Sequence, residues 1–445
     1  MPLWRHQVEA VDFILRVKRG AIWGDTGIGK TGIGIEISDQ LGANLTLVIC
    51  PVLAVEMWKA QFEIRGRLRR DVVIVRSPDA ALWGANVIVV PFSLISKYPA
   101  LARRLRQYRF DLLIIDEAHA LKTLDSNRTQ AIYRIGDERG GLQDRAPFTV
   151  LLSATLSPNG FPSELYPHLR ALRPELLGPA IGYDSFVARY CEVKFGRGGR
   201  EQIVGAKKTT APELKRIVAR VALRIKKRDV QDLPAVVTDT WPINAVDLVM
   251  PNEIKGELER AEALLARDIG SLTGEEALAV ARASPHSATY RRLVGLLKLQ
   301  AMSALLTVEL EQGGKTIVFA YHTAVIEALA ERFKAQGAVV IDGSTSAAKR
   351  IANVKAFREN AKTRLFIGQI AACSEVLDLS GCASMWFCES DWTPKSITQA
   401  VGRSNRPGQV EPLTVRILTL SSSIDDAMAR TLVRKTKDIE MLEPV

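Results

Sequence analysis

Short apolar runs alternate with amphipathic stretches through the first half of the chain. The apolar runs are too short for helices and are typical of buried strands. They lie at Leu45–Cys50, Val72–Val75, Val87–Val90, Leu112–Ile115 and Thr149–Leu152. Stretches with helical spacing separate them, at Val55–Phe62, Leu94–Leu105 and Arg128–Ile135. This alternation predicts a parallel, doubly wound α/β sheet.

A second α/β pattern follows Leu233-Pro234, after a basic stretch that loses the alternation. Its expected strands are Thr316–Ala320, Val339–Ile341, Leu365–Ile367, Met385–Cys388 and Thr414–Leu418. Its expected helices are Ala324–Gln336, Ala347–Arg358 and Lys395–Val401. We therefore expect two parallel-sheet domains. The first spans residues 1–232, with a basic helical protrusion at about 173–232; the second spans 233–445, with a helical protrusion at about 251–313.

A glycine-rich segment after the apolar run Ala21–Trp23 fits the pattern G-x-x-x-x-G-K-[ST]. Its residues are Gly24, Asp25, Thr26, Gly27, Ile28, Gly29, Lys30 and Thr31. The glycines let backbone N–H groups turn toward phosphates, where a Cβ would crowd them. Lys30 would reach the β- and γ-phosphates of ATP, and the Thr31 hydroxyl would bind Mg²⁺. The segment predicts an ATP site at a strand-to-helix turn.

An acidic pair, Asp116-Glu117, directly follows the apolar run Leu112–Ile115. Carboxylates at the carboxyl end of a central strand lie where open α/β sheets bind ligands. In a phosphoryl-transfer site Asp116 would hold Mg²⁺ and Glu117 would orient and deprotonate water. By itself the pair also fits a capped helix start, so the prediction depends on the upstream glycine-rich segment.

Composition narrows the class of protein. The chain has 445 residues, a net charge of +11 and a pI of about 9.4, which favours a polyanionic partner or a merely soluble basic protein. Its five cysteines show no CxxC pairs, which indicates buried thiols in a reducing compartment rather than disulfides or a zinc site. We expect no membrane-spanning segment and no signal peptide, because no apolar run approaches the length of a span.

With these segments in place, the chain resembles a superfamily-two helicase motor, specifically the Swi/Snf-type DNA translocases and their fork-remodelling (annealing-helicase) branch. The likeness covers nearly the whole chain. It includes the extension Ala120-Leu121-Lys122 after Asp116-Glu117-Ala118-His119, and the run Gln399 to Gln409. The resemblance implies two RecA-like domains with ATP in the cleft between them.

The resemblance also implies roles for individual residues. Arg5 and Gln7 would bind ATP, and His119, Ser153 and Thr155 would couple hydrolysis to motion. Gln399, Arg403 and Arg406 would act in catalysis, the two arginines as fingers that stabilise charge on the γ-phosphate. Residues in position to contact nucleic acid are Pro51, Trp58, Phe92, Ser93, Lys122, Tyr321, His322, Ser344, Thr345 and Trp392. Further basic candidates for DNA phosphates are Arg197, Arg200, Lys207, Lys208, Arg291 and Arg292.

One segment departs from the family pattern. Around Glu375 the family usually carries a glycine and a threonine, whereas this chain has Val376 and Asp378. An acidic side chain is unfavourable against a phosphate backbone. The departure bears on how well the second domain couples to DNA.

The leading interpretation is an ATP- and Mg²⁺-dependent translocase on duplex or branched DNA, acting without sequence preference through backbone contacts. Two alternatives stay open: a strand-separating DNA or RNA helicase, and an ATP-gated DNA-binding clamp with little turnover. Fork remodelling, branch migration or annealing in replication, recombination or repair would be the process served. We expect a cytoplasmic protein of prokaryotic or viral origin.

Overall fold

The computed structural model resolves two compact units, and each is described by itself. The described residues are 3–134, 140–195, 201–230, 236–244, 248, 252–269, 284–373, 377, 379–389, 394–404, 411–421, 423, 426, 429 and 442–443. The first unit groups Met1–Val230 with Lys437–Val445, and the second comprises Gln231–Thr436. The expectation that the second domain runs to residue 445 is therefore wrong for its last residues. Leu442 is fully buried in the first unit's core, which holds the chain end there.

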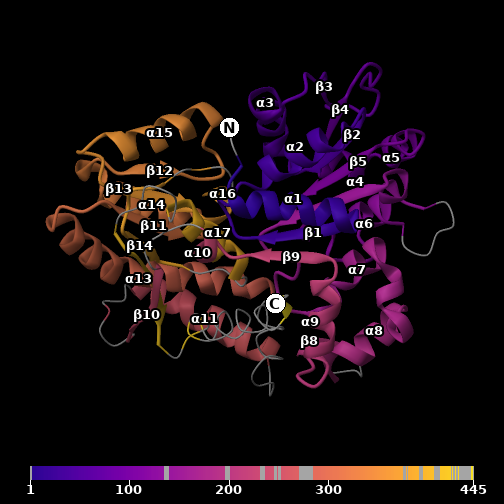
Figure 1. Cartoon of the computed structure of the whole chain (residues 1–445). Helices are drawn as coiled ribbons and strands as arrows, with labels where there is room; N and C mark the ends of the chain where they lie inside the picture. Colours follow the sequence, from indigo (N-terminus) through magenta and orange to yellow (C-terminus); the bar gives the residue numbers. More distant parts are fainter. Residues whose placement is uncertain are drawn as a thin grey trace. The chain divides into compact units, whose positions relative to one another are not determined.

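The first unit is built on a seven-stranded sheet in the order β3-β4-β2-β5-β6-β1-β9 (Figure 1). Every neighbouring pair is parallel. The strands are β1 (Arg19–Gly24), β2 (Thr46–Cys50), β3 (Val72–Ile74), β4 (Val87–Pro91), β5 (Leu112–Asp116), β6 (Phe148–Ser153) and β9 (Ala222–Ile225). The doubly wound α/β prediction is confirmed.

Both faces of this sheet are covered, which explains why its strands are apolar without alternation. In β5, Leu113 and Ile115 face one core cluster while Leu112 and Ile114 face the other. The second cluster lies under α1 (Arg5–Val17), α2 (Lys30–Gln40) and α3 (Val55–Arg65). The first lies under α4 (Phe92–Lys97), α5 (Pro99–Leu105), α6 (Asn127–Ile132), α7 (Tyr166–Leu172), α8 (Tyr183–Tyr190) and α9 (Ala211–Ala219).

The basic stretch at about 173–232 is not simply a helical protrusion. It contains α8 and α9, the antiparallel pair β7 (Cys191–Phe195) and β8 (Glu201–Ala206), and α10 (Lys227–Val230). It also supplies β9, which extends the main sheet beside β1. The prediction missed β9 because its sequence, Ala-Leu-Arg-Ile, is short and runs into basic residues.

The second unit has a six-stranded sheet in the order β10-β15-β14-β11-β13-β12, again with parallel pairs (Figure 1). Its strands are β10 (Val236–Ile243), β11 (Thr316–Ala320), β12 (Val339–Ile341), β13 (Leu365–Gln369), β14 (Ser384–Phe387) and β15 (Leu413–Leu420). Its helices include α11 (Asn252–Ile269), α13 (Pro285–Glu311), α14 (Thr323–Arg332), α15 (Ala347–Glu359), α16 (Ile370–Cys373) and α17 (Pro394–Ser404). Each unit thus has the parallel α/β architecture expected of a RecA-like domain.

Helix α13 is a core helix rather than the protrusion expected at about 251–313. Met302, Leu306 and Leu310 pack in the cluster on one face of the second sheet, while the preceding turns pack against α11. By length and composition α13 is apolar enough to cross a membrane. Its apolar residues are instead used in packing, and the buried Lys298 donates from Nζ to the carbonyl of Leu418 in β15 at 3.0 Å.

Candidate active site

The turn between β1 and α2 forms a loop with the geometry of an anion site. Gly27 and Gly29 have φ values of 88° and 80°, in the left-handed region that favours glycine. Lys30 begins α2 and folds back, so that its Nζ donates to the carbonyls of Gly24 at 2.8 Å and Asp25 at 3.0 Å. A positive side chain and a helix N-terminus therefore face the interior of one loop.

Helix α1 packs its first turn against this loop. The Gln7 side chain donates from Nε2 to the carbonyls of Ile28 at 3.2 Å and Gly29 at 3.4 Å. The His6 ring nitrogen Nε2 lies 3.0 Å from the same Ile28 oxygen. A Cβ on Gly29 would lie 2.2 Å from Gln7 Nε2, so close packing also requires glycine there. Gln7 is thus buried beside the loop, whereas Arg5 is exposed and paired within α1.

The carboxylate of Asp116 is buried at the end of β5. It accepts hydrogen bonds from Trp58 Nε1 at 2.9 Å and from the backbone N–H of Glu117 at 3.0 Å. Burial and the neighbouring Glu117 carboxylate raise the pKa of Asp116 to about 6, against the lowering effects of Trp58 and Lys30. Two hydrogen bonds therefore orient this carboxylate without compensating its negative charge.

Glu117 begins a polar connection from β5 to β6. Its backbone has φ 52°, a left-handed conformation that is strained for a side chain with a Cβ and that recurs at functional sites. Its Oε2 pairs with His119 Nδ1 at 3.1 Å, and that nitrogen also lies 3.1 Å from Ser153 Oγ. Ser153 Oγ donates to the Thr155 carbonyl and accepts from the Thr155 N–H at 3.3 Å. The three residues expected to couple hydrolysis to motion are therefore joined to Glu117 in one network.

The sheet order brings these parts to one edge. Strand β6 separates β5 from β1, with Asp116 in register with Leu152 and Trp23 in register with Ser153. The loop after β1, the acidic pair after β5 and the Ser153 segment after β6 consequently emerge at the same carboxyl edge.

A second group of charged residues beside the loop was not predicted. Arg224, at the end of β9, pairs through Nη2 with Asp25 Oδ1 at 2.7 Å. The backbone N–H of Lys227 donates to the other oxygen of Asp25 at 2.9 Å. Glu443 pairs with Arg224 Nε at 2.8 Å and with Lys226 Nζ at 3.2 Å. The basic run Arg224–Arg228 was visible in the sequence, but nothing there indicated its place beside the phosphate loop.

Two residues expected to contact nucleic acid are unsuited to that role. Trp58 is fully buried and its indole N–H is used on Asp116, so it positions a carboxylate instead. Phe92 is buried in the core cluster beneath α4. Both misassignments have the same cause, since an aromatic side chain beside a predicted site is equally suited to a core. Pro51 is half-buried and Ser93 is exposed, and Lys122 pairs with Glu164 at 2.7 Å.

In the second unit, Tyr321 and His322 follow β11 and are held by the buried Glu389. Its Oε2 accepts from both backbone N–H groups at 2.9 Å, and its Oε1 lies 2.6 Å from His322 Nδ1. The Arg291 guanidinium lies 4.6 Å from the Tyr321 ring centroid, in a cation–π contact. Tyr321 remains partly exposed, so its ring is available at the surface of the unit.

The remaining candidates of the second unit lie on two segments. Ser344 and Thr345 both donate from their hydroxyls to Asp342 Oδ1, at 2.8 and 2.7 Å. Gln399 is buried in α17, and Arg403 is half-buried near the end of that helix. Several expected residues lie outside the described part of the chain, namely Arg197, Arg200, Glu375, Val376, Asp378, Trp392 and Arg406.

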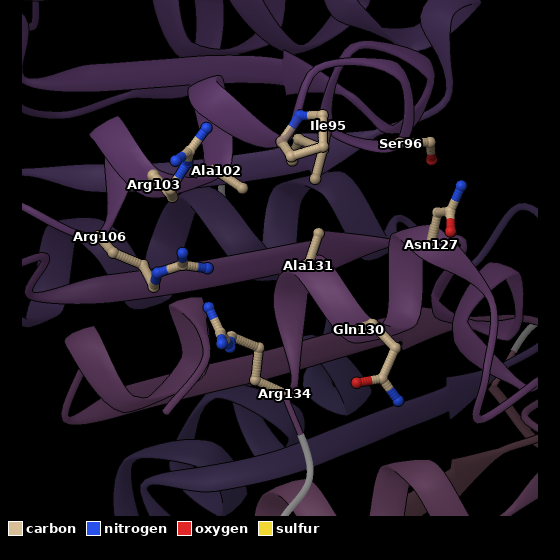
Figure 2. Close-up of a pocket in the computed structure, with 10 residues that line it drawn as sticks. Ile95, Ser96, Ala102, Arg103, Arg106, Asn127, Gln130, Ala131 and Arg134 are labelled. Atoms are coloured by element: carbon tan, nitrogen blue, oxygen red, sulfur yellow. The ribbon is translucent and has the colours of Figure 1, made fainter. Parts of the chain in front are cut away.

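A cavity of 390 Å³ lies in the first unit, between α4, α5 and α6 (Figure 2). Arg103, Arg106 and Arg134 line it, and Figure 2 shows the Arg106 and Arg134 guanidinium groups pointing toward one another. None of the expected site residues is among the residues that line it. The arginines lie in or just after the last turns of α5 and α6, where cations are favoured at helix carboxyl ends.

Comparison with known proteins gives two family matches. Residues 1–157 match the family described as "Type III restriction enzyme, res subunit", and residues 297–408 match "Helicase conserved C-terminal domain". The chain is 25% identical over 441 residues to a SWI/SNF-related regulator of chromatin subfamily A-like protein 1 of Drosophila melanogaster, covering 96% of this chain and 54% of that protein. It is also 25% identical over 448 residues to the DNA annealing helicase and endonuclease ZRANB3 of Bos taurus, covering 97% of this chain and 40% of that protein.

The chain thus spans about half or less of the length of these relatives. Among solved structures, the Sulfolobus solfataricus SWI2/SNF2 ATPase core in complex with dsDNA aligns with a TM-score of 0.46 and 18% identity, over 96% of this chain and 89% of that one. One family match falls on each of the two parallel-sheet units, and the relatives span both. These matches support a superfamily-two helicase of the Swi/Snf type.

Proposed function

We propose that this protein is an ATPase that translocates on duplex or branched DNA and serves fork remodelling, branch migration or annealing. The observation that carries the proposal is the shared sheet edge in the first unit. There the phosphate loop, the Asp116-Glu117 pair and the His119–Ser153 contact emerge from β1, β5 and β6. The SWI/SNF-related and annealing-helicase names of the relatives support DNA as the substrate.

The residues of this edge fit MgATP. The Thr31 hydroxyl and the Asp116 carboxylate are hard oxygen donors of the kind that Mg²⁺ prefers. The raised pKa of Asp116 shows negative charge that a cation would compensate. When bound, Mg²⁺ would neutralise charge on the phosphates. Lys30 and the loop N–H groups would then hold the β- and γ-phosphates, while Gln7 and Arg5 would lie on the nucleotide's other end.

Glu117 is placed to take a proton from the attacking water, because its carboxylate is next to Asp116 and is oriented by His119. A change in the position or charge of Glu117 on hydrolysis would alter its contact with His119, and through it the contact of His119 with Ser153. These contacts would couple ATP hydrolysis to motion. In the second unit, Gln399, Arg403 and Arg406 would stabilise charge on the γ-phosphate during transfer. Ser93, Lys122, Tyr321, Ser344 and Thr345 would contact DNA.

The proposal also includes a reducing, cytoplasmic setting. All five cysteines are buried and free. Burial raises the pKa of Cys191 to about 11 and that of Cys382 to about 12, so these thiols stay protonated and unreactive.

The test is ATP turnover measured with duplex, forked and single-stranded DNA and with RNA, all of matched length. Duplex or forked DNA should stimulate turnover most, and Lys30→Ala and Glu117→Gln should both abolish it. Glu117→Gln should still bind ATP, because it keeps the shape of the site and loses only the base. Wild-type turnover in Glu117→Gln would overturn the assignment of the site.

The same assay separates the two alternatives. Stimulation by single strands alone, or displacement of a strand from a tailed duplex, would favour a strand-separating helicase. Weak turnover that no nucleic acid stimulates would favour an ATP-gated clamp.

A further inference from the structure

Strand β9 carries a second set of cations to the phosphate loop. Its register pairs Arg224 with Trp23 and Ile225 with Gly24, so β9 ends where the loop begins. The N–H of Asp25 donates to the Ile225 carbonyl at 3.1 Å, which continues the pairing by one residue. The residues just after β9 are therefore held against the loop by backbone hydrogen bonds.

Lys227 is the first residue of α10 and lies against the middle of the loop. Its side chain is buried, and a Cβ on Gly27 would lie 3.4 Å from its Nζ and 3.6 Å from its Cε. Gly27 itself is exposed and in the left-handed conformation. A lysine ammonium is rarely buried unless an anion or hydrogen-bond acceptors compensate for lost water. Its position places a second ammonium at the loop, in addition to that of Lys30.

Arg224 and Glu443 fix this arrangement from behind. Arg224 bonds Asp25 through Nη2, and its Nη1 donates to the carbonyls of Trp23 at 3.3 Å and Ile225 at 2.8 Å. Glu443 is buried and pairs with both Arg224 and Lys226. The chain end is anchored by the fully buried Leu442, so the carboxylate is held in place by packing as well as charge.

The charges of this cluster do not cancel. Arg224, Lys226 and Lys227 carry three positive charges, whereas Asp25 and Glu443 carry two negative ones. One positive charge in excess, next to backbone N–H groups at a helix N-terminus, suits a bound anion. A purely structural cluster would be expected to balance its buried charges.

We propose that Lys227 binds the phosphates of the nucleotide as a second lysine of the loop, and that Arg224 and Glu443 are positioning residues for it. This rests on the proposed ATPase function and adds a contact to it. Lys227 would approach from the Gly27 side of the loop and Lys30 from the start of α2. The chain terminus then forms part of the nucleotide site, although it follows the second unit in sequence.

The experiment measures ADP and AMP binding by calorimetry to wild type, Lys227→Met, Lys227→Arg and the control Lys215→Met. Lys215 is a partly exposed lysine of α9 in the same unit. Lys227→Met should weaken ADP binding by about tenfold or more, as expected for one charge-assisted contact, and AMP binding far less. Lys227→Arg should retain most of the ADP affinity, and Lys215→Met should match wild type.

Glu443→Gln tests the positioning role through a double-mutant cycle. It should weaken ADP binding by about threefold in wild type and hardly at all in the Lys227→Met background, because its effect acts through Lys227. Unchanged ADP affinity in Lys227→Met, with or without a lower melting temperature, would overturn the proposal. So would equal Glu443→Gln effects in the two backgrounds. If wild type fails to bind ADP, or Lys30→Ala leaves binding unchanged, the ATPase proposal fails instead.

Discussion

Two buried carboxylates at equivalent ends of the two sheets have opposite electrostatics. Asp116 is the last residue of β5 in the first unit, and Glu389 lies just beyond β14 in the second. Burial and Glu117 raise the pKa of Asp116 to about 6. Burial also works to raise the pKa of Glu389, but the hydrogen bonds and charge of His322, with the charge of Lys298, lower it overall.

The difference is that protein donors compensate the charge of Glu389, whereas the charge of Asp116 would be compensated by a bound cation. Glu389 receives three donors from Tyr321 and His322, and a Cβ on Gly295 would lie 2.6 Å from its Oε1. Protein groups fill its surroundings. Asp116 is oriented by Trp58 but stands next to another carboxylate, which is unfavourable until a cation arrives. The difference supports the role proposed for Asp116, whereas the contacts of Glu389 hold the segment that carries Tyr321.

Among the tests of this comparison, Asp116→Asn should have the largest effect, on ATP turnover. The amide oxygen can still accept the hydrogen bond from Trp58, but the charge that would hold Mg²⁺ is lost, so ATP turnover should fall to background. Thermal stability should stay equal or rise, because an uncompensated buried charge is lost. Turnover at saturating Mg²⁺ and a melting curve without ligand are the two measurements. A destabilised protein with normal turnover would reverse the assignment.

Arg403→Ala tests whether the second unit contributes to the chemistry at all. Turnover should fall by about a thousandfold if Arg403 stabilises the γ-phosphate charge. Arg403→Lys should recover only part of it, because the planar guanidinium is lost. Arg358→Ala, near the end of α15, is the matched control and should retain turnover. Full activity in Arg403→Ala would make that arginine structural.

Glu389→Gln should lower the stability of the second unit, whereas Asp116→Asn should lower ATP turnover. Removing the charge weakens the bond to His322 and leaves Lys298 without its nearby carboxylate charge. The free energy of unfolding of the second unit should fall by about 2 kcal/mol. Hydrogen exchange in β11 and β14 would report this locally. Unchanged protection there, together with lost turnover, would place Glu389 in catalysis.

His168 should make the first unit sensitive to acid at a higher pH than Glu389 does in the second unit. Burial, with the charge of His119, lowers the pKa of His168 from 6.5 to about 3 in the folded state. Between these values the unfolded chain binds a proton that the folded unit does not. The contribution of His168 to stability is therefore full above pH 6.5 and falls as the pH drops toward 3, whereas Asp116, whose pKa is raised to about 6, contributes with the opposite sign below that value. For Glu389, whose pKa is lowered, loss begins only below its ordinary value of 4.5.

His168→Gln should flatten this dependence in the first unit, because glutamine can accept from Tyr133, as His168 Nδ1 does at 3.0 Å, without titrating. Hydrogen exchange in β5 and β6, compared at pH 5 and pH 7, measures it. His286→Gln in the second unit serves as the control. Equal acid sensitivity of wild type and His168→Gln would contradict the prediction.

The smallest effects concern individual DNA contacts. Each lysine or arginine that neutralises a phosphate should add about −0.9 to the slope of log affinity against log salt on duplex DNA. We expect smaller contributions to this slope from two candidates, because Lys122 pairs with Glu164 and Arg291 is buried against Tyr321. Lys208→Ala should reduce the slope by one contact and leave sequence preference unchanged. A scrambled duplex of equal length is the control.

Local sequence was sufficient for much of the fold and for the positions of several candidate site residues. Apolar runs without alternation predicted the parallel sheets, because strands buried on both faces have no polar face to show. The pattern from Gly24 to Thr31 predicted a strand-to-helix loop with glycines, and the structure has Gly27 and Gly29 in the left-handed conformation just before α2. The acidic pair at the end of β5 was likewise predictable, because the apolar sequence of that strand showed where it ends.

For a residue on a helix, the sequence did not predict whether its side chain points into the core or toward the surface. Trp58 and Phe92 stood beside expected sites and were assigned to DNA, but the structure turns both inward. Which face of a short helix meets the core depends on how that helix docks, and an aromatic residue suits a core and a binding surface equally. The contact between His119 and Ser153 was easier to anticipate, since one lies shortly after β5 and the other ends β6, and both strands were predicted.

By itself the sequence determined two doubly wound units, the glycine-rich loop between β1 and α2 and the two carboxylates at the end of β5, because each depends on a few neighbouring residues. Only the tertiary structure decided that β9 adds beside β1, which joins Asp25 to Lys227 across 202 residues of chain. Only the tertiary structure likewise brought Glu443 to Arg224. Contacts of that kind depend on strand order and on where a chain end is buried, and neither leaves a periodic signal in the sequence.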